Sequence, residues 1–395
     1  MDPAVWFQED MIMDCKLRAK NCGGCPMLAT KYTAQLKKKE ADVRALLGKY
    51  GPVSPIRGME TPYHYRNKVI STFAPAAGGK LTSGIYAART HKVLPVESCL
   101  LQDEVLDKVM LAVRAAANAC RYQPFNEDKG TGLLRRGVAT GQVMVVLVTA
   151  QPVLPGAKNF VKALLAEAEK RGVPVTTVVQ NYNPRRTSVV LGEDEKVLYG
   201  KGFILDTLCG KTYALSPRSF YQVNPVQTAV LYGLAVDAAH LTGKEVVLDA
   251  YCGIGTIGLT ASDKARQVVG VEVNRDAVRD AIGNAKHNGV KNARFFAADA
   301  TAWIREAADA GQKADVVFMD PPREGSTLAF IESVARMAPK RIVYVSCNPE
   351  TMARDLALLT QKGYRAEGFT PVDMFPHSAH CEVVCALSRT SSGKR

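Results

Sequence analysis

The C-terminal half of the chain alternates apolar segments of strand length with helical segments, and this alternation constrains the fold more than any other feature. Strands are expected at residues 245–250, 267–273, 293–298, 314–319 and 341–345. Such an alternation predicts a doubly wound α/β sheet of parallel strands, because each return to a parallel strand needs a crossover helix. A further apolar segment, after Glu382, is expected to form an antiparallel strand at the edge of the sheet. Ligands of these sheets bind at the carboxyl ends of the strands.

Polar residues follow the first three strands and predict a ligand that contains adenosine. A loop with Gly253 and Gly255 joins the first strand to a helix, and glycine lets a backbone approach a ligand closely. Glu272 ends the second strand, where a carboxylate can accept hydrogen bonds from both ribose hydroxyls. Asp299 follows the third strand and can accept a hydrogen bond from an adenine amino group. Dinucleotide-dependent enzymes share this pattern, so it does not identify the cofactor further.

The last two parallel strands end in residues that narrow the chemistry. The sequence Asp-Pro-Pro-Arg at residues 320–323 predicts a stiff loop that presents the Asp320 carboxylate to a planar group. Cys347 follows the strand at 341–345, so the sheet would hold its thiol rigidly at the ligand-binding edge. Glu382 stands just before the antiparallel strand. The alternatives without a catalytic role are that Cys347 is a buried apolar residue and that Glu382 is a surface carboxylate.

A thiol and a carboxylate at one edge meet the needs of methylation at a pyrimidine ring carbon. Carbon 5 of uracil is barely nucleophilic, but a thiolate that adds to carbon 6 makes an enolate whose carbon 5 can attack a methyl sulfonium. A base must then remove the carbon 5 proton so that the thiolate can leave. The sequence therefore predicts Cys347 as the nucleophile and Glu382 as the general base.

Positive charge is concentrated in the first half of the chain. Residues 1–205 contain 29 Lys and Arg against 18 Asp and Glu, whereas residues 206–395 contain 22 against 20. A local basic excess favours a polyanionic partner, although it can also serve solubility alone. The arginine pairs at 135–136 and 185–186 favour nucleic acid. Strand and helix patterns over residues 51–206, with helices at 104–119 and 157–170, predict a central α+β domain that carries these contacts.

No segment indicates export or insertion into a membrane. The first residues include Glu9, Asp10 and Asp14, which a secretory signal would not tolerate, and the longest apolar run, at 143–150, is too short to cross a bilayer. We therefore expect a cytoplasmic protein whose ten cysteines do not form disulfides.

Four of these cysteines are predicted to form a metal site. Cys15, Cys22 and Cys25 lie close together beside two glycines, and Cys99, after an extended segment, is the candidate for the fourth ligand. Three close thiolates and one distant thiolate favour a [4Fe–4S] cluster. Zinc is the alternative, although zinc sites usually pair two close couples of ligands. A helix follows at residues 32–47 and completes an N-terminal segment over residues 1–50; its three lysines at 37–39 indicate a solvated face.

Together these motifs resemble the S-adenosylmethionine-dependent RNA uridine-C5 methyltransferases, and in particular the branch that modifies 23S rRNA. The resemblance extends over nearly the whole chain and also includes the sequence Ser-Phe-Tyr-Gln-Val-Asn-Pro at 219–225. It implies a Rossmann-like methyltransferase domain over residues 207–395, the catalytic roles given above for Cys347 and Glu382, and a [4Fe–4S] cluster on the four cysteines. The residues implied for contacts with S-adenosylmethionine are Gln222, Tyr251, Gly253, Gly255, Thr256, Glu272, Asp299 and Asp320.

The resemblance also sets expectations about the RNA. Many members of the 23S rRNA branch begin with a small β-barrel RNA-binding domain, which this sequence, with fourteen residues before Cys15, is expected to lack. The target uridine must leave its stack, so we expect it in single-stranded or loop RNA, bound by a monomeric enzyme. Two alternatives remain: the same reaction on tRNA, whose enzymes lack the four cysteines, and a non-catalytic iron–sulfur RNA-binding factor that keeps the fold.

Overall fold

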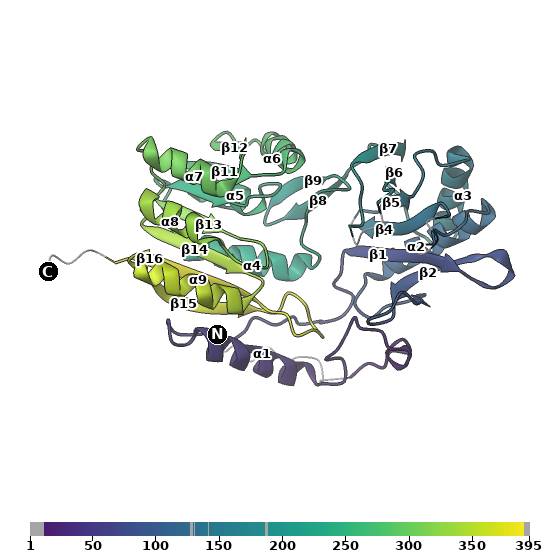
Figure 1. Ribbon diagram of the computed structural model, residues 1–395, viewed down its shortest axis with the longest axis horizontal. Helices are drawn as coiled ribbons and strands as arrows, with labels where there is room; N and C mark the ends of the chain where they lie inside the picture. Colours follow the sequence, from purple (N-terminus) through teal and green to yellow (C-terminus); the bar gives the residue numbers. More distant parts are fainter. Residues whose placement is uncertain (1–11, 127–128, 130, 141, 186–188, 391–395) are drawn as a thin grey trace.

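The computed structural model describes residues 12–390 except 127–128, 130, 141 and 186–188, so Arg186 of the second arginine pair lies outside the described residues. Two seven-stranded sheets dominate the structure, one from the C-terminal half and one from the central part of the chain (Figure 1). No helix within the described ranges is long and apolar enough to cross a membrane.

The C-terminal sheet is the doubly wound sheet that the sequence predicts. Its strands are β10 (Val246–Ala250), β11 (Gln267–Glu272), β12 (Ala293–Ala297), β13 (Val316–Met319), β14 (Arg341–Ser346), β15 (Tyr364–Val372) and β16 (Glu382–Arg389). They lie in the order β12-β11-β10-β13-β14-β16-β15, and the first five in this order are parallel. The five predicted strands are confirmed to within two residues at each end.

Helices cover both faces of this sheet, which confirms a Rossmann-like α/β fold. They are α4 (Pro225–Ala238), α5 (Thr256–Ala261), α6 (Arg275–His287), α7 (Ala300–Asp309), α8 (Leu328–Met337) and α9 (Pro349–Gln361). Alternate strand residues enter two separate cores. Val247 and Val343 pack in the core that includes α4, α5 and α6, whereas Leu248 and Ile342 pack in the core that includes α7, α8 and α9. This alternation follows from the two-residue period of a strand.

The antiparallel strand is internal, and the prediction that it forms the edge is wrong. β16 pairs with β14 on one side and with β15 on the other. β15 was not expected, yet its residues Tyr364 and Phe369 are buried and supply a further apolar layer. Pro371 lacks an N–H donor, which suits an outer strand. The sheet therefore extends one strand further than the sequence indicates.

Helix α1 and the segment that follows it pack on this C-terminal sheet (Figure 1). Helix α1 (Tyr32–Leu47) coincides with the predicted helix and places Val43 and Leu47 in the core that contains α9. The segment at 52–57 then runs along β15, and the peptide N–H of Ser54 donates to the carbonyl of Phe369 at 2.8 Å. The outer edge of the sheet is thereby covered rather than bare.

The central sheet is mixed. Its strands are β1 (Lys68–Pro75), β2 (Leu81–Tyr86), β3 (Val93–Pro95), β4 (Leu134–Thr140), β5 (Met144–Thr149), β6 (Thr177–Tyr182) and β7 (Asp194–Tyr199), in the order β3-β2-β1-β4-β5-β6-β7. Only β5 and β6 are parallel among the described pairs, because α3 (Ala157–Glu169) crosses between them. Together with α2 (Glu104–Ala119), α3 packs against the sheet in one core. Both helices were predicted.

A hairpin connects the two sheets. Its strands, β8 (Ile204–Leu208) and β9 (Lys211–Leu215), lie between the sheets in Figure 1. Ile204 and Tyr213 of the hairpin pack in one core with Val138 of β4 and with residues of the C-terminal sheet. The predicted domain boundary between residues 206 and 207 falls inside β8, so the division into domains stays a prediction.

Candidate active site

Cys347 lies between the end of β14 and the start of α9. Asn348 caps the helix, since its side-chain oxygen accepts the N–H of Glu350 at 3.1 Å, while its amide nitrogen donates to the carbonyl of Arg323 at 3.2 Å. The thiol is partly exposed and precedes the N-terminus of a 13-residue helix. The positive end of a helix favours a thiolate.

The register of β16 on β14 brings Glu382 to the same edge as Cys347. Ser346, the last residue of β14, pairs with Val383, so the next position sets Cys347 opposite Glu382. Because β16 is antiparallel, its first residue lies where β14 ends. Glu382 is only 3% exposed, and within the described part of the chain no hydrogen bond is made to its carboxylate.

Burial and neighbouring carboxylates raise the pKa values of the groups at this edge. Burial raises the pKa of Asp320 to about 7. Burial, together with the charge of Asp320, raises the pKa of Glu382 to about 8. Burial and then the charges of Glu382 and Asp320 raise the pKa of the Cys347 thiol to about 11. The Glu382 carboxylate is thus the largest charge that opposes the thiolate, so a proton on Glu382 eases ionisation of Cys347.

Helix α9 fixes the loop that follows Asp320. The Arg354 guanidinium donates to the carbonyls of Glu324 at 3.0 Å and Ser326 at 2.9 Å. Gly325 adopts a positive φ of 76°, and a Cβ at this position would lie 2.6 Å from the Arg354 guanidinium. The loop with Asp320 and the helix after Cys347 therefore form one rigid unit.

A cavity of about 540 Å³ opens beside Cys347. Arg323, Cys347 and His380 line it from the edge of the sheet. The opposite wall comes from α1 through Lys39, Asp42, Val43, Ala45 and Leu46. This volume falls within the range of small-molecule sites, about 300–1,000 Å³.

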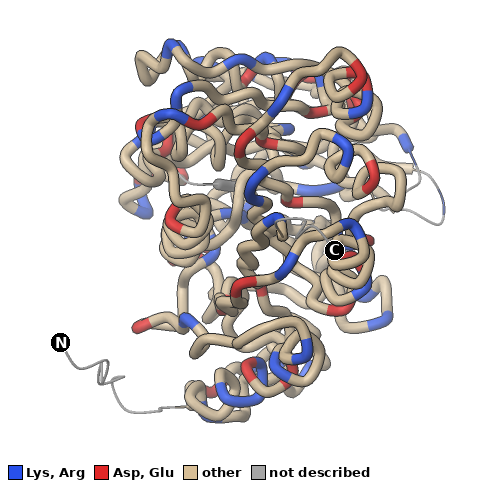
Figure 2. The backbone as a smooth tube through the Cα atoms, turned by 90° about the vertical axis from the view of Figure 1, so that its left-hand side faces the viewer, with Lys and Arg blue, Asp and Glu red and all other residues tan. Residues whose placement is uncertain are grey.

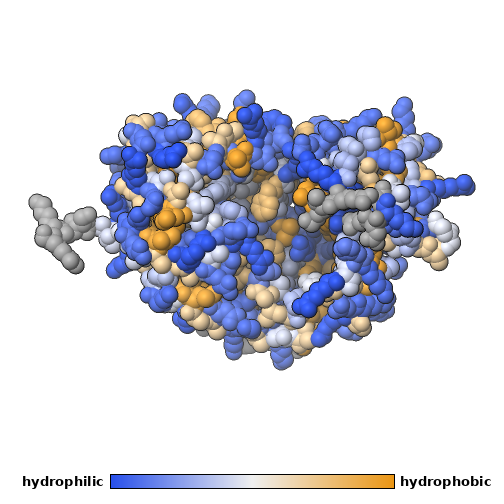
Figure 3. Space-filling view, viewed as in Figure 1, coloured by the Kyte–Doolittle hydropathy of each residue, from blue (hydrophilic) through white to orange (hydrophobic). Residues whose placement is uncertain are grey.

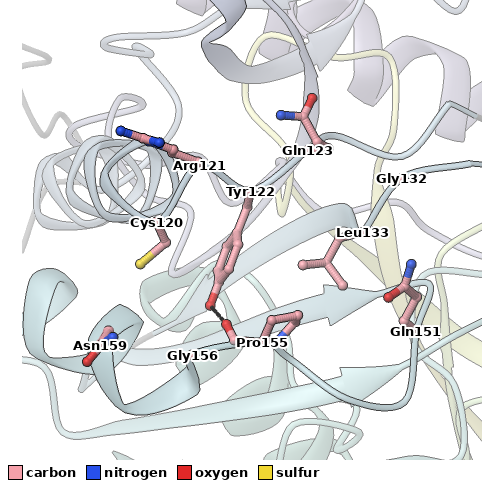
Figure 4. Close-up of a pocket in the computed structure, with 10 residues that line it drawn as sticks. All are labelled: Cys120, Arg121, Tyr122, Gln123, Gly132, Leu133, Gln151, Pro155, Gly156 and Asn159. Carbon is pink, nitrogen blue, oxygen red and sulfur yellow. Dashed lines mark hydrogen bonds between the residues drawn. The ribbon is translucent and has the colours of Figure 1, made fainter.

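A second cavity, of about 560 Å³, lies at α2 and α3 of the central part (Figure 4). Tyr122 crosses it and donates its hydroxyl to the carbonyl of Pro155 at 2.5 Å. Cys120 also lines this cavity, but burial raises the pKa of its thiol. No carboxylate or histidine stands among the described residues that line the cavity, so it lacks a base for the thiol.

The loop after β10 turns through unusual backbone conformations. Tyr251, Gly253 and Gly255 all have positive φ, at 64°, 54° and 84°. Gly255 has no room for a side chain, since a Cβ there would meet the ring of Phe295 at 3.0 Å. Positive φ is costly for tyrosine, and such strain is found where a loop is held for a ligand.

Two of the predicted cofactor carboxylates lie at the adjacent strand ends. Glu272 is half-buried and accepts the backbone N–H groups of Gly253 at 3.2 Å and Asn274 at 2.8 Å. Asp299 is exposed and caps α7 by accepting the N–H of Ala302 at 2.9 Å. Glu272 thus joins the glycine loop to the end of β11, as a ribose-binding carboxylate at this edge would require.

The other two predicted cofactor residues lie on elements that flank the loop. Thr256 begins α5, and its hydroxyl pairs with that of Tyr232 at 3.3 Å. Gln222 lies before α4, and its carbonyl accepts the side-chain amide of Asn67 at 3.3 Å. No hydrogen bond in the described part of the chain uses the Gln222 side chain, so the structure does not join it to the other predicted residues.

The other three predicted metal ligands lie close enough to Cys25 to affect its pKa. Burial, and then the thiols of Cys99, Cys22 and Cys15, raise the pKa of Cys25 to about 12. Cys25 and Cys99 also pack against one small core that contains Tyr32. Thiols that raise one another's pKa require a nearby cation before all of them can ionise. Nevertheless, no three His, Cys, Asp or Glu side chains among the described residues are arranged to hold a metal ion, so the cluster stays a prediction.

Two basic residues do not have the exposed positions that the sequence suggests. Arg135 is 4% exposed, and its guanidinium donates to the carbonyls of Asn183 and Arg185. Lys39 belongs to a lysine run expected to be solvated, but it is 2% exposed and forms an ion pair with Asp373 at 2.5 Å. Burial of these long side chains depends on partners far away in the sequence.

Phe220 is a candidate that sequence reasoning missed. It lies two residues before Gln222 and is 72% exposed. A large exposed aromatic side chain is suited to stack on an unpaired base. Phenylalanine is usually buried, so only the structure reveals this exposure.

Comparison with known proteins agrees with this geometry. The model of a family described as tRNA (uracil-5-)-methyltransferase matches residues 31–390. An uncharacterised RNA methyltransferase of Halalkalibacterium halodurans is 41% identical over 377 residues, which cover 93% of this chain and 81% of that protein. One from Listeria monocytogenes is 41% identical over 384 residues, 94% of this chain and 83% of that protein.

A solved structure supports the same assignment. The crystal structure of Pyrococcus abyssi tRNA (uracil-54, C5)-methyltransferase, in complex with S-adenosyl-L-homocysteine, superposes with a TM-score of 0.74 and 26% identity. The match covers 93% of this chain and 86% of that one. The strained glycine loop, the carboxylates at the strand ends and the family match all lead to one conclusion. The chain belongs to the tRNA (uracil-5-)-methyltransferase family and is an S-adenosylmethionine-dependent RNA (uracil-5-)-methyltransferase.

Proposed function

We propose that the protein methylates carbon 5 of a uridine in 23S rRNA through a covalent adduct between Cys347 and carbon 6 of the base, with Glu382 as the general base. The observation that carries this proposal is the β14–β16 register, whose last pair, Ser346 with Val383, brings Glu382 beside Cys347, where the charge of Glu382 raises the pKa of the thiol. A non-catalytic RNA-binding factor would have no need for this pairing, which buries a carboxyl without a hydrogen-bond partner among the described residues.

The proposed reaction conserves atoms and charge. The Cys347 thiolate adds to carbon 6 of uracil, and the resulting enolate attacks through carbon 5. Bound S-adenosylmethionine supplies the electrophilic methyl group for this attack. Glu382 then takes the carbon 5 proton, the electrons of that bond re-form the double bond between carbons 5 and 6, and the carbon–sulfur bond breaks to return the thiolate.

The adduct can be trapped by removing the base. Glu382→Gln should transfer methyl to RNA but remain covalently attached to it, visible as a slow band on a denaturing gel. Cys347→Ala should form no adduct, and Glu306→Gln, an exposed change on α7, should behave as wild type. Absence of any adduct with Glu382→Gln, or with 5-fluorouridine RNA, would overturn the mechanism.

The choice of 23S rRNA rests on the four cysteines, which the resemblance associates with the rRNA branch. The effect of the Cys99, Cys22 and Cys15 thiols on the pKa of Cys25 supports that choice, because it requires Cys99, which is distant in sequence, to lie near the N-terminal cysteines. Mapping 5-methyluridine in total RNA from a deletion strain tests it: a uridine of 23S rRNA should lose its methyl group. Loss of methylation in tRNA instead would establish the second candidate, which the likeness to an archaeal tRNA (uracil-54, C5)-methyltransferase favours.

We propose that the eight predicted residues bind S-adenosylmethionine, seven of them from the carboxyl ends of β10, β11, β12 and β13 and Gln222 from the segment before α4. The support is the strained loop at Tyr251, the link from Gly253 to Glu272 and the exposed carboxylate of Asp299. Val273, which is 71% exposed, would add an apolar contact to the adenine. Glu272→Ala should weaken binding of S-adenosylhomocysteine in calorimetry by roughly tenfold or more, the value of one charge-assisted hydrogen bond.

We also propose that Cys15, Cys22, Cys25 and Cys99 hold a [4Fe–4S] cluster that orders the N-terminal segment. Such a cluster would supply the positive charge that lets the coupled thiols ionise together. Anaerobic purification, iron and sulfide analysis and a visible spectrum test this. Zinc in place of iron, or no metal, would refute it.

RNA contacts are proposed for residues 51–206, which hold much of the excess positive charge. Seen from the side of the C-terminal sheet, basic and acidic residues are interspersed along the backbone (Figure 2). The face in Figure 3 is hollowed between the two sheets, where the carboxyl ends of β13 and β14 point. A flipped, single-stranded or loop uridine entering there would reach Cys347. We further propose that the enzyme acts as a monomer, because every proposed catalytic group comes from the same sheet edge of one chain. We place this monomer in the cytoplasm.

A further inference from the structure

The residues that lead from β15 to Glu382 form a loop at 373–381, here called the base loop. Its middle is held by the N-terminal segment. Gln35 of α1 has no exposed surface, and its side-chain oxygen accepts the peptide N–H of His377 at 3.0 Å. Its amide nitrogen lies 3.1 Å from Nδ1 of the same histidine. The Gln35 side chain therefore contacts both the backbone and the side chain of His377 in the base loop.

Gln35 also joins the base loop to the cysteine-rich segment. Its amide nitrogen lies 3.1 Å from the carbonyl of Met27 and 2.7 Å from that of Thr30. Met27, two residues after Cys25, in turn donates its N–H to the carbonyl of His377 at 3.1 Å. Hence the segment after Cys25, α1 and the base loop share one buried set of hydrogen bonds.

Neighbouring contacts fix the same part of the base loop. His377 is 1% exposed, has a φ of 65° and stacks on Tyr63 with ring centroids 4.7 Å apart. The Tyr65 hydroxyl donates to the carbonyl of Pro376 at 3.2 Å. A left-handed histidine is costly, so the loop keeps this path only while its surroundings hold it. All of these partners precede the central sheet in sequence.

Cys347 depends on a different set of anchors. Its position follows from β14 and from the cap of α9, where Asn348 accepts the N–H of Glu350. The Gln35 side chain bonds to Met27, Thr30 and His377, and none of these hydrogen bonds reaches Asn348 or Glu350. A disturbance at Gln35 should therefore displace Glu382 without displacing the thiol.

We propose that Gln35 is a positioning residue for the proton-removal step, and that the N-terminal segment sets the place of Glu382 through His377. This inference rests on the proposed role of Glu382 as the base. A base must lie within hydrogen-bond reach of the proton that it removes, and a misplacement of about 1 Å can cost roughly 100-fold in rate. Loss of the contacts between Gln35 and His377 should slow release of the methylated RNA, while thiolate addition and methyl transfer continue.

The test compares Gln35→Leu with wild type, using total RNA from a deletion strain and S-adenosylmethionine carrying a labelled methyl group. In a single turnover, Gln35→Leu should transfer the label at a rate near that of wild type but retain roughly tenfold more covalent adduct after transfer. Ala34→Leu, the exposed neighbour on α1, should leave the adduct level unchanged. Thermal denaturation checks that each variant is folded.

His377→Asn provides a second measurement, and it decides the matter if Gln35→Leu fails to fold. Asparagine tolerates a left-handed backbone but cannot make the ring contacts with Gln35 and Tyr63. It too should raise the level of adduct. Equal slowing of methyl transfer and release, or unchanged release, would overturn the inference. Glu382→Gln, run in parallel, separates the two failures: if that variant traps no adduct, the proposed mechanism itself is wrong.

Discussion

At the scale of single residues, the pKa of Glu382 decides the pH at which the proposed adduct can resolve. The carboxylate is the active base, and burial beside Asp320 raises its pKa from 4.5 to about 8. Resolution of a preformed adduct should therefore accelerate about tenfold per pH unit below about pH 7 and level off above about pH 8. Rapid-quench kinetics on isolated adduct measures this rate. Ionisation of Cys347 does not contribute to it, because the sulfur is already bonded to carbon 6 in the adduct. A profile flat from pH 6 to 8 would remove Glu382 from the role of base.

The same raised pKa makes Glu382 a cost to stability. Between the unfolded and folded pKa values the folded state binds the extra proton, so the free energy of unfolding falls as pH rises from about 4.5 to about 8. Glu382→Gln escapes this loss. Its stability relative to wild type should increase from pH 5 to pH 8 by more than about 1 kcal/mol, the equivalent of one pKa unit. Urea unfolding at both pH values measures the change, with Glu306→Gln as a control that should show none.

At the scale of elements, one buried ion pair joins α1 to the base loop. Lys39 donates to Asp373, which also accepts the Tyr32 hydroxyl at 2.7 Å, and both charged side chains are buried. Lys39→Met leaves the Asp373 carboxylate without its cation and should lower the free energy of unfolding by about 3–5 kcal/mol. Chemical denaturation measures this.

The neighbouring lysine supplies a matched control. Lys38 pairs with Asp42 at 2.9 Å, but both side chains are more than half exposed. Lys38→Met should change the free energy of unfolding by less than about 1 kcal/mol. The double variant Lys39→Met/Asp373→Asn should recover part of the loss. Equal effects of the two lysine changes would mean that α1 does not depend on the buried pair.

At the scale of the whole molecule, uneven charge should govern RNA affinity. Residues 1–205 carry 29 basic against 18 acidic residues. A site with about four phosphate contacts would lose roughly 50-fold in affinity between about 50 and 200 mM salt. Filter binding with total RNA measures the slope. Exposed Lys92→Ala on the central part should reduce the slope by about 0.7, whereas Lys362→Ala, after α9, should leave it unchanged.

The local sequence pattern predicts much of the fold and of the candidate site. Apolar runs and crossover helices located β10 to β14, since strand and helix periods are local properties of a sequence. Cys347 and Asp320 follow directly from those strand ends, because parallel strands must present their carboxyl ends together. The glycine loop at 253–255 is likewise local, because the positive φ angles of Gly253 and Gly255 favour glycine.

Other features depend on contacts that no local pattern encodes. The sequence placed Glu382 before a strand, but only the pairing with β14 set it opposite Cys347, and only β15 made that strand internal. The sequence indicates a solvated Lys39, because its partner Asp373 lies 334 residues away. The exposure of Phe220 and the contacts between Gln35 and His377 likewise depend on the tertiary structure. Sequence alone determined which residues stand at the strand ends, since periodicity is short-range. Tertiary structure decided which of them meet, because burial, pKa and register depend on partners brought together by folding.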